Sequence, residues 1–486
     1  MALRSVMSSK VPIVIILGAT GTGKTKLGVE LAQKFKTEII SADSMQIYKG
    51  LDIVTAKATA QERSLVAHHL LDILEPHQMF TVVDFRNRAL SIIDNLSQQG
   101  KIPLVVGGTN YYVESIVYNI LVEDADNTNE LLWDSSKRKR DFENEDDEIP
   151  ESTEKRNIVD ATDEKSISKP DDREGPSSND DESGTNDLEV TKEALQEFVD
   201  NEKKFTNEEV HDKLRLIDPV QAGRLHPNNR RKVLRSIEVW LHSGRRHSEV
   251  LAEQRGEEGR LRHPGATLVL WLKCEQSVHD SRLDTRVDAM LRAGLLQELE
   301  AFHRRHNLRR LQGGQPPDYT KGIFQTLGFK EFHEYLMLPE EEKSSEQGQK
   351  LLEMSIDNMK MATRRYARRQ NKMTRGRFLE HPNREIPPIY ELDTTNIELW
   401  DTEVREKAIH IVESFLNGEE CRFQPLKSQV DDERKNDDEN SYNYCNVCER
   451  IIIGDRTYRI HMKSNKHKKV LKKKNEEAKK NQDVPK

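Results

Sequence analysis

The segment Gly18 to Thr25 constrains the fold of this chain more than any other part of its sequence. It fits the pattern G-x-x-x-x-G-K-[ST] and lies between an apolar, β-branched run, Val11 to Leu17, and a segment with helical apolar spacing, Lys24 to Phe35. Glycines in this pattern let backbone N–H groups converge on phosphate oxygens, and the start of the helix adds partial positive charge. The pattern therefore predicts a phosphate-binding loop that opens an α/β domain, with candidate contacts at Gly18, Thr20, Gly21, Thr22, Gly23, Lys24 and Thr25.

Further apolar segments follow at the spacing of a doubly wound parallel sheet. Glu38 to Ser41 ends just before Asp43, Ile102 to Val106 ends before Gly107-Gly108-Thr109, and Ala266 to Leu272 is another buried strand candidate. Alternating strands and helices favour a parallel sheet whose ligand lies outside the carboxyl ends of the strands. Long helices are expected over 229–241, 278–302 and 351–373.

The loop alone does not identify its ligand. Lys24 supplies a mobile cation and the Thr25 hydroxyl suits Mg²⁺. A nucleotide hydrolase normally carries a second strand that ends in an acidic residue holding this metal. The strand candidate before Gly107 has no such carboxylate, and the acid at a strand end is instead Asp43. We therefore expect a bound diphosphate, with incomplete machinery for transfer of a γ-phosphate.

Charge is distributed unevenly along the 486 residues, although the net charge is only −8. Acidic residues dominate Asp141 to Glu189, and lysines dominate the C-terminal end. The basic run Lys137 to Arg140 is either a nuclear localisation signal or a solvated charge run. The expected organisation is a first core part over 11–122, an acidic disordered insertion over 123–190, a helical insertion over 191–260, a second core part with basic helices over 261–425, a linker over 426–440, a finger over 441–471 and a lysine-rich tail over 472–486.

The C-terminal part contains the spacing of a Cys₂His₂ zinc site, Cys445-x₂-Cys448-x₁₂-His461-x₅-His467. Two thiolates and two imidazoles complete a closed tetrahedron, so we expect structural Zn²⁺. Lysines beside the second half of the motif suit RNA phosphates, and a protein-binding finger is the alternative. With four cysteines in all, a disulfide scaffold is excluded. No apolar run reaches the ~18 residues of a membrane span, so no membrane partner is expected.

Taken together, these segments resemble the tRNA dimethylallyltransferases (tRNA isopentenyltransferases), and the finger resembles an extension of the eukaryotic members. The resemblance covers Pro12 to Phe378 except the acidic insertion. The matching motifs are Gly18–Thr25, Asp43–Ile53, Thr55–Lys57, His69–Asp72, Asp84–Arg86, Gly107–Tyr112, His226–Asn228, Arg235–Val239, Arg282–Asp288, Gly328–Phe329 and Thr363–Gln370.

The resemblance implies transfer of a dimethylallyl group from dimethylallyl diphosphate to N6 of the adenosine 3′-adjacent to the anticodon in tRNA. It implies a phosphate-loop sheet with a helical tRNA-binding insertion, catalytic Mg²⁺ and a monomeric protein. Asp43 would be the general base, and Lys24, Mg²⁺ on Thr25 and Arg286 would stabilise the leaving diphosphate. The implied catalytic residues are Asp43, Thr109 and Arg286, and the implied tRNA contacts are Asp43, Ser44, Met45, Gln46, Arg231, Lys232, Arg235, Arg364, Arg365 and Arg368.

Simpler interpretations exist for many of these residues. In these interpretations Arg286 is a surface arginine that pairs with Asp284 or Asp288, and Ser44 and Gln46 are turn residues. The basic rows on the helices are then ordinary solvent-exposed faces. Competing functions are a prenyltransferase acting on free adenine nucleotides, a phosphate-loop kinase or NTPase, and a non-catalytic RNA-binding protein. A cytoplasmic, mitochondrial or also nuclear location fits the sequence.

Overall fold

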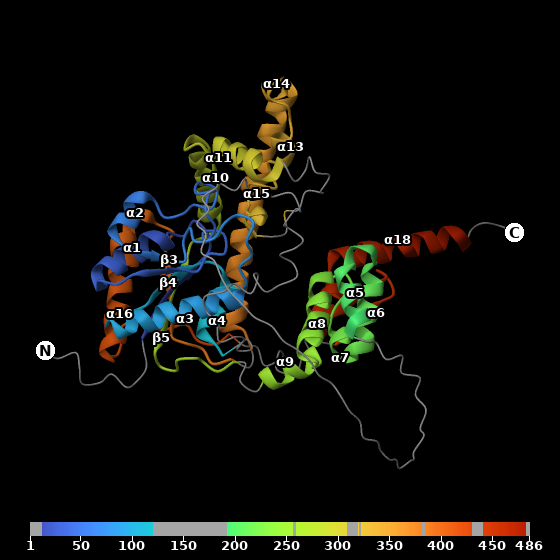
Figure 1. Cartoon of the computed structure of the whole chain (residues 1–486), viewed down its shortest axis with the longest axis horizontal. Helices are drawn as coiled ribbons and strands as arrows, with labels where there is room; N and C mark the ends of the chain where they lie inside the picture. Colours follow the sequence, from blue (N-terminus) through green and yellow to red (C-terminus); the bar gives the residue numbers. More distant parts are fainter. Residues whose placement is uncertain are drawn as a thin grey trace, which may run out of the picture. The chain divides into compact units, whose positions relative to one another are not determined.

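The computed structural model describes residues 12–119, 192–255, 259–308, 319, 322–381, 384–429 and 441–482 (Figure 1). The expected acidic insertion over 123–190, including the basic run at 137–140, lies outside these residues. The chain divides into two compact units, one formed by 1–139 with 249–486 and the other by 140–248.

A parallel sheet forms the centre of the first unit, with the strand order β3-β2-β4-β1-β5-β6. Its strands are β1 (Ile13–Gly18), β2 (Ile39–Ser41), β3 (His68–His69), β4 (Leu104–Gly107), β5 (Thr267–Lys273) and β6 (Ile389–Asp393). All pairs are parallel, and β1 lies between β4 and β5, with Ile15 opposite Val105 and Val269. Every residue of β1 is buried because apolar, mostly β-branched side chains cover both of its faces. The predicted α/β class is confirmed.

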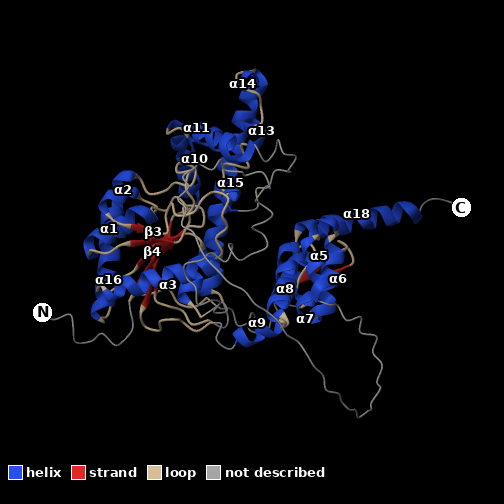
Figure 2. Ribbon diagram, viewed as in Figure 1, coloured by secondary structure: helices blue, strands red, loops and turns tan. Residues whose placement is uncertain are grey.

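Helices enclose this layer of strands (Figure 2). They are α1 (Lys24–Phe35), α2 (Ala60–Leu65), α3 (Val82–Gln98), α4 (Asn110–Val117), α10 (Gln276–Arg292), α11 (Leu295–Phe302), α13 (His333–Leu336), α14 (Glu340–Lys343), α15 (Glu346–Thr374) and α16 (Lys407–Asn417). One apolar cluster packs Leu27 and Leu31 of α1 and Ile411 of α16 against Val14 of β1 and Leu270 of β5. Hydrophobic burial of this kind fixes α1, and with it the loop before α1, on the sheet.

The prediction of one long helix over 278–302 is wrong in one respect, because the chain forms two helices there. Gly294 adopts a φ of 100° between α10 and α11, a left-handed conformation that ends the first helix and caps the second. The later helix, α15, begins earlier than expected because Ser345 caps it, its Oγ accepting a bond from the N–H of Gly348 at 3.0 Å.

The second unit is a small helical bundle. Its helices are α5 (Lys192–Asp200), α6 (Asn207–Ile217), α7 (Pro219–Arg224) and α8 (Arg230–Ser243), and α9 (His247–Arg255) begins at its end. Leu195, Val210, Leu214, Val233 and Ile237 belong to its apolar core. The unit therefore has its own core, as expected of an inserted domain.

The two segments of the first unit that flank this insertion are bonded to each other. Tyr118 and Leu261 form an antiparallel bridge. The N–H of Asn119 donates to the carbonyl of Arg260 at 3.2 Å, and the N–H of Arg262 donates to the carbonyl of Val117 at 2.8 Å. The chain therefore leaves and re-enters the first unit at one place.

The C-terminal finger consists of the hairpin β7 (Tyr442–Cys445) and β8 (Arg450–Ile453), followed by α17 (Asp455–Lys463) and α18 (Asn465–Gln482). Helix α18 continues into the expected lysine-rich tail as far as Gln482, through strong helix-forming lysines, glutamates and alanine. The start of the expected linker is hydrogen-bonded to the first unit, because the N–H groups of Leu426 and Gln429 donate to the carbonyls of Ile389 and Leu379. Among the described helices, none is both long and apolar enough to cross a membrane.

Candidate active site at the carboxyl ends of the strands

The loop from Gly18 to Thr25, here called the glycine loop, joins β1 to α1 without space for side chains at two of its glycines. A Cβ on Gly21 would lie 2.7 Å from Leu283, and a Cβ on Gly23 would lie 2.6 Å from the ring of Trp400. Both glycines also have φ values near 80–90°, at 78° and 89°. The loop is therefore tightly packed, and its glycines are required for both space and conformation.

Lys24 begins α1 and turns its ammonium back into the glycine loop, where Nζ donates to the carbonyl of Ala19 at 2.7 Å. Burial lowers the pKa of Lys24 to about 8; the negative charge of Asp43 opposes this shift and the positive charge of Arg286 adds to it. The loop of β2 and helix α10 thus bring their charged residues close to this lysine. An ammonium that is poorly solvated by its surroundings is suited to bind an anion.

Asp43 lies half-buried just after β2. Its Oδ1 accepts bonds from the N–H groups of Met45 at 2.9 Å and Gln46 at 3.4 Å, which fixes the orientation of the carboxylate. The pKa of Arg286 is lowered by burial and raised by Asp43, and burial and then Asp43 raise the pKa of Tyr366. The ammonium of Lys24, the guanidinium of Arg286 and the phenol of Tyr366 therefore all lie within electrostatic range of the Asp43 carboxylate.

Thr109 connects the two strand-end loops on which the predicted catalytic residues lie. Its N–H donates to the carbonyl of Ala42 at 3.2 Å, and its Oγ1 accepts a bond from the N–H of Ser44 at 3.1 Å. A Cβ on Gly107 would lie 2.1 Å from the carbonyl oxygen of Ala42, so only glycine permits this approach. The Asp43 and Thr109 loops are thereby held together.

Helices α10 and α15 are joined by three ion pairs, here called the ion-pair ladder. Both rows have a spacing of four residues, which places their members on one helix face. The pairs are Asp280 with Arg368, Asp284 with Arg364, and Asp288 with Lys360 at 2.6 Å. The two acids that could have neutralised Arg286 therefore bind α15 instead.

The ladder also bears on the predicted RNA contacts. Arg364 and Arg368 are engaged with aspartates of the chain, whereas Arg365 is exposed on the same helix. In the second unit the exposed basic residues of α8 are Arg231, Lys232 and Arg235, the last 4.0 Å from Glu238. Contact of all these residues with tRNA stays a prediction.

Two other residues predicted near the adenosine have partners within the protein. The amide nitrogen of Gln46 donates to the carbonyls of Thr55 at 3.1 Å and Ala56 at 3.2 Å. The Met45 sulfur accepts a bond from Thr326 Oγ1 at 3.3 Å. These contacts hold the segment after Asp43 in place, and contact with a nucleotide stays a prediction for both residues.

Sequence reasoning missed three residues that contact the glycine loop. Gln370 bonds to Thr20 and Gly108, His279 bonds to Thr20, and Trp400 packs against Gly23. Gln370 closes a motif identified in the sequence, so its position carried a signal even though its role did not. His279 and Trp400 carried no signal that separates them from ordinary core residues.

The finger residues bring four ligand atoms together, all within 4.8 Å of one another. Nδ1 of His467 lies 3.5 Å from the sulfurs of Cys445 and Cys448 and 3.2 Å from Nε2 of His461. A tetrahedral zinc ion with bonds of ~2.3 Å to sulfur and ~2.0 Å to nitrogen requires edges of about 3.5 Å and about 3.3 Å. The donor set therefore fits a structural Zn²⁺ ion.

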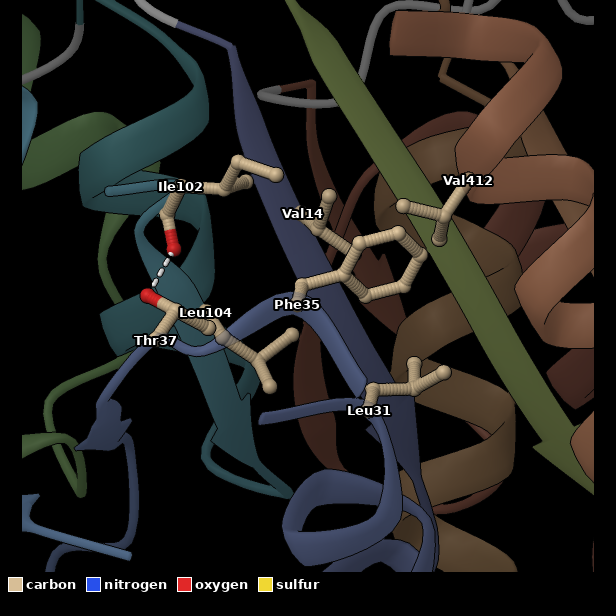
Figure 3. Close-up of a pocket in the computed structure, with 7 residues that line it drawn as sticks. All are labelled: Val14, Leu31, Phe35, Thr37, Ile102, Leu104 and Val412. Atoms are coloured by element: carbon tan, nitrogen blue, oxygen red, sulfur yellow. Dashed lines mark hydrogen bonds between the residues drawn. The ribbon is translucent and has the colours of Figure 1, made fainter. Parts of the chain in front are cut away.

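A small apolar cavity lies away from this site. Figure 3 shows the side chains of Val14, Leu31, Phe35, Leu104 and Val412 turned toward one another, with Thr37 and Ile102 beside them. Val14 and Leu104 are at the amino ends of β1 and β4, opposite the ends that carry the predicted catalytic residues. The cavity is a feature of the core.

Comparison with known families finds three matches along the chain. The family described as IPP transferase matches residues 46–174 and 181–377, and the family described as isopentenyl transferase matches residues 11–72. The family described as a zinc-finger double-stranded RNA-binding domain matches residues 442–468.

Individual proteins are similar over nearly the whole length. The "tRNA dimethylallyltransferase" of Mus musculus is 39% identical over 95% of this chain and 86% of its own length, and that of Homo sapiens is 38% identical with the same coverage. A solved structure described as a eukaryotic dimethylallyltransferase acting on tRNA is 26% identical, with a TM-score of 0.68 over 97% of this chain and 99% of that one.

Proposed function

The chain belongs to the tRNA dimethylallyltransferase family, and we propose that it transfers a dimethylallyl group from dimethylallyl diphosphate to N6 of the adenosine 3′-adjacent to the anticodon in tRNA. The observation that carries the proposal is the meeting of Lys24, Asp43 and Arg286 beside the glycine loop. Two cations suit a leaving diphosphate, and one carboxylate suits the proton that the attacking amine must lose.

Asp43 acts as the general base in this proposal. An exocyclic adenine amine is a weak nucleophile, so its proton must be accepted as the bond to carbon forms. The N–H groups of Met45 and Gln46 donate to Oδ1 of Asp43 and so set the orientation of the carboxylate. Oδ2 accepts no hydrogen bond from the described residues, so it is the oxygen that would take the proton.

The glycine loop holds the diphosphate, which is the leaving group. Negative charge grows on the ester oxygen, which joins the dimethylallyl carbon to phosphorus, as the carbon–oxygen bond breaks, and Lys24 and Arg286 stabilise that charge. Thr25 would hold Mg²⁺, which supplies further neutralisation of the diphosphate when bound. The hydroxyl is at the second residue of α1, next to Lys24, so the donor type and its place fit this metal.

The acceptor is an RNA loop whose target base must leave its stack to reach Asp43. The exposed cations Arg231, Lys232 and Arg235 of α8, with Arg365 of α15, are proposed to bind flanking phosphates. The zinc-bound finger adds a further basic contact. We propose that one copy of the chain suffices, because every catalytic group named here comes from the same unit.

The test measures label transfer from radiolabelled dimethylallyl diphosphate to tRNA and, separately, to AMP. Asp43→Ala is expected to lower kcat by about 10²–10⁴-fold, the range for loss of a general base, with tRNA affinity within about twofold of wild type. Asp94→Ala is the matched control, since Asp94 is an exposed residue of α3. Transfer to AMP alone, or most of the activity retained in Asp43→Ala, would contradict the proposal.

A further inference from the structure

We propose that Gln370 is a positioning residue that holds the glycine loop and the Thr109 loop in register, so that the donor and the acceptor adenosine meet in line. This role rests on the proposed function. It concerns a side chain of α15 that lies 350 residues from its partner in the glycine loop.

The Gln370 side chain is buried, with 5% of its surface exposed, and both of its amide atoms are used. Its Oε1 accepts a bond from the N–H of Thr20 at 2.9 Å, and its Nε2 donates to the carbonyl of Gly108 at 3.0 Å. Thr20 belongs to the loop proposed to bind the diphosphate, and Gly108 precedes Thr109. A carboxamide is suited to this bridge because it offers one acceptor and one donor on the same planar group.

The surroundings are shaped for this amide. A Cβ on Gly108 would lie 2.4 Å from Nε2 of Gln370, so the side chain occupies the space that glycine leaves. The hydroxyl of Thr374, one helical turn later, donates to the amide oxygen of Asn110 at 2.9 Å. Helix α15 therefore binds residues on both sides of Thr109.

Thr20 is held from a second helix as well. Nε2 of His279, on α10, donates to the carbonyl of Thr20 at 2.8 Å. Helices α10 and α15 are themselves joined by the ion-pair ladder, and α10 carries Arg286. The N–H of Thr20 is directed to Gln370 rather than to the diphosphate, so we assign Thr20 to the support of the glycine loop.

This arrangement matters for the reaction because the donor is fixed by one loop and the acceptor side by the other. In-line displacement requires the attacking nitrogen, the carbon and the leaving oxygen to be aligned, and a misplacement of about 1 Å can cost about 10²-fold in rate. Gln370 supplies the only direct side-chain bridge between the two loops among the described residues. Its loss should therefore affect kcat more than donor binding.

The experiment compares Gln370→Met, Gln370→Glu and the matched control Gln349→Met in the full chain. Gln349 lies on the same helix, about 30 Å along its axis, where its amide donates to the carbonyl of Lys343 at 2.9 Å. Gln370→Met is expected to lower kcat for tRNA prenylation by about 10- to 100-fold and to change the Kd of dimethylallyl diphosphate by less than about threefold. Gln349→Met should leave both unchanged.

Gln370→Glu separates positioning from general stability. A protonated glutamic acid offers the same donor and acceptor as glutamine, whereas the carboxylate repels the Gly108 carbonyl. The ratio of its kcat to that of wild type should therefore rise as the pH falls from 8 to 6, while the ratio for Gln370→Met stays flat. The charged and titratable groups near these loops are the same in wild type and in the variants. Dividing the kcat of each variant by that of wild type at the same pH therefore removes their contribution; these groups are Lys24, Asp43, Arg286 and His279.

Amide hydrogen exchange gives a readout that needs no activity. The peptides containing Thr20 and Gly108 should exchange faster in Gln370→Met than in Gln349→Met. Equal exchange in the two variants, a kcat of Gln370→Met within about twofold of wild type, or equally flat pH ratios would overturn the role of Gln370. Failure of the wild-type chain to prenylate tRNA would instead overturn the proposed function, and the exchange comparison would still decide on Gln370.

Discussion

Binding of dimethylallyl diphosphate should be coupled to uptake of a proton by Lys24. Burial lowers the pKa of this ammonium to about 8 in the free protein, and Arg286 contributes in the same direction. A bound diphosphate places negative charge beside the ammonium and favours its protonated form. Protein molecules in which Lys24 is neutral must therefore gain a proton as the donor binds.

The size of the coupling follows from the pKa. With a pKa of about 8 in the free protein, uptake on binding should be about 0.1 proton at pH 7, about 0.5 at pH 8 and about 0.9 at pH 9. Donor affinity should then fall by about tenfold between pH 7 and pH 9. The diphosphate contributes little to this change, because the last ionisation of a phosphate monoester occurs near pH 6.

Calorimetry in two buffers of different ionisation enthalpy, without tRNA and at constant Mg²⁺, measures this uptake directly. In Lys24→Arg the uptake should disappear, because a guanidinium stays charged throughout this range. Lys34→Arg, a change at an exposed lysine of the same helix, should leave it intact. Equal uptake in wild type and Lys24→Arg, or none in wild type at pH 8, would refute the reasoning.

Three other perturbations test separate parts of the structure. Gly23→Ala should lower the free energy of unfolding, measured in urea, by about 1–3 kcal/mol, because Gly23 has a φ of 89° and an added Cβ would clash with Trp400. In the control Gly376→Ala the added Cβ meets nothing within 4 Å, so this change should be close to neutral. Equal losses in the two variants would contradict the reasoning. Asp284→Arg and Arg364→Asp should each lower the free energy of unfolding by about 0.5–1 kcal/mol, and the double variant with both charges exchanged should recover most of that loss. Additive losses in the double variant would exclude a direct ion pair. Chelation of zinc should reduce the helical circular dichroism of the finger and weaken tRNA affinity more than kcat, and unchanged tRNA affinity would contradict an RNA role for the finger.

The sheet could be predicted in its centre but not at its edges. The strands β1, β4 and β5 are apolar on both faces and stand out in the sequence. The edge strands β3 and β6 do not, because His68–His69 has only two residues and Ile389–Asp393 carries the charged residues Glu391 and Asp393. Short or half-polar strands are defined by their neighbours rather than by their own pattern.

The candidate site shows the same division between local pattern and long-range contact. The approach of Asp43 to Lys24 followed from the rule that carboxyl ends of parallel strands share one edge. The ion-pair ladder could not be predicted, because Arg364 lies 80 residues from Asp284 and a basic row on a helix looks the same whether it faces RNA or aspartates. Likewise, only the folded chain places Gln370 between two loops.

The position of β1 between β4 and β5 has a consequence for the time course of synthesis. One edge of β1 can pair once Leu104–Gly107 has been made, but the other must wait for Thr267–Lys273, roughly 250 residues after β1. At about 5–20 residues per second, a ribosome takes about 12–50 s to supply that partner. During this interval the nascent chain exposes an unpaired apolar strand edge, the kind of surface that chaperones bind and that seeds aggregation.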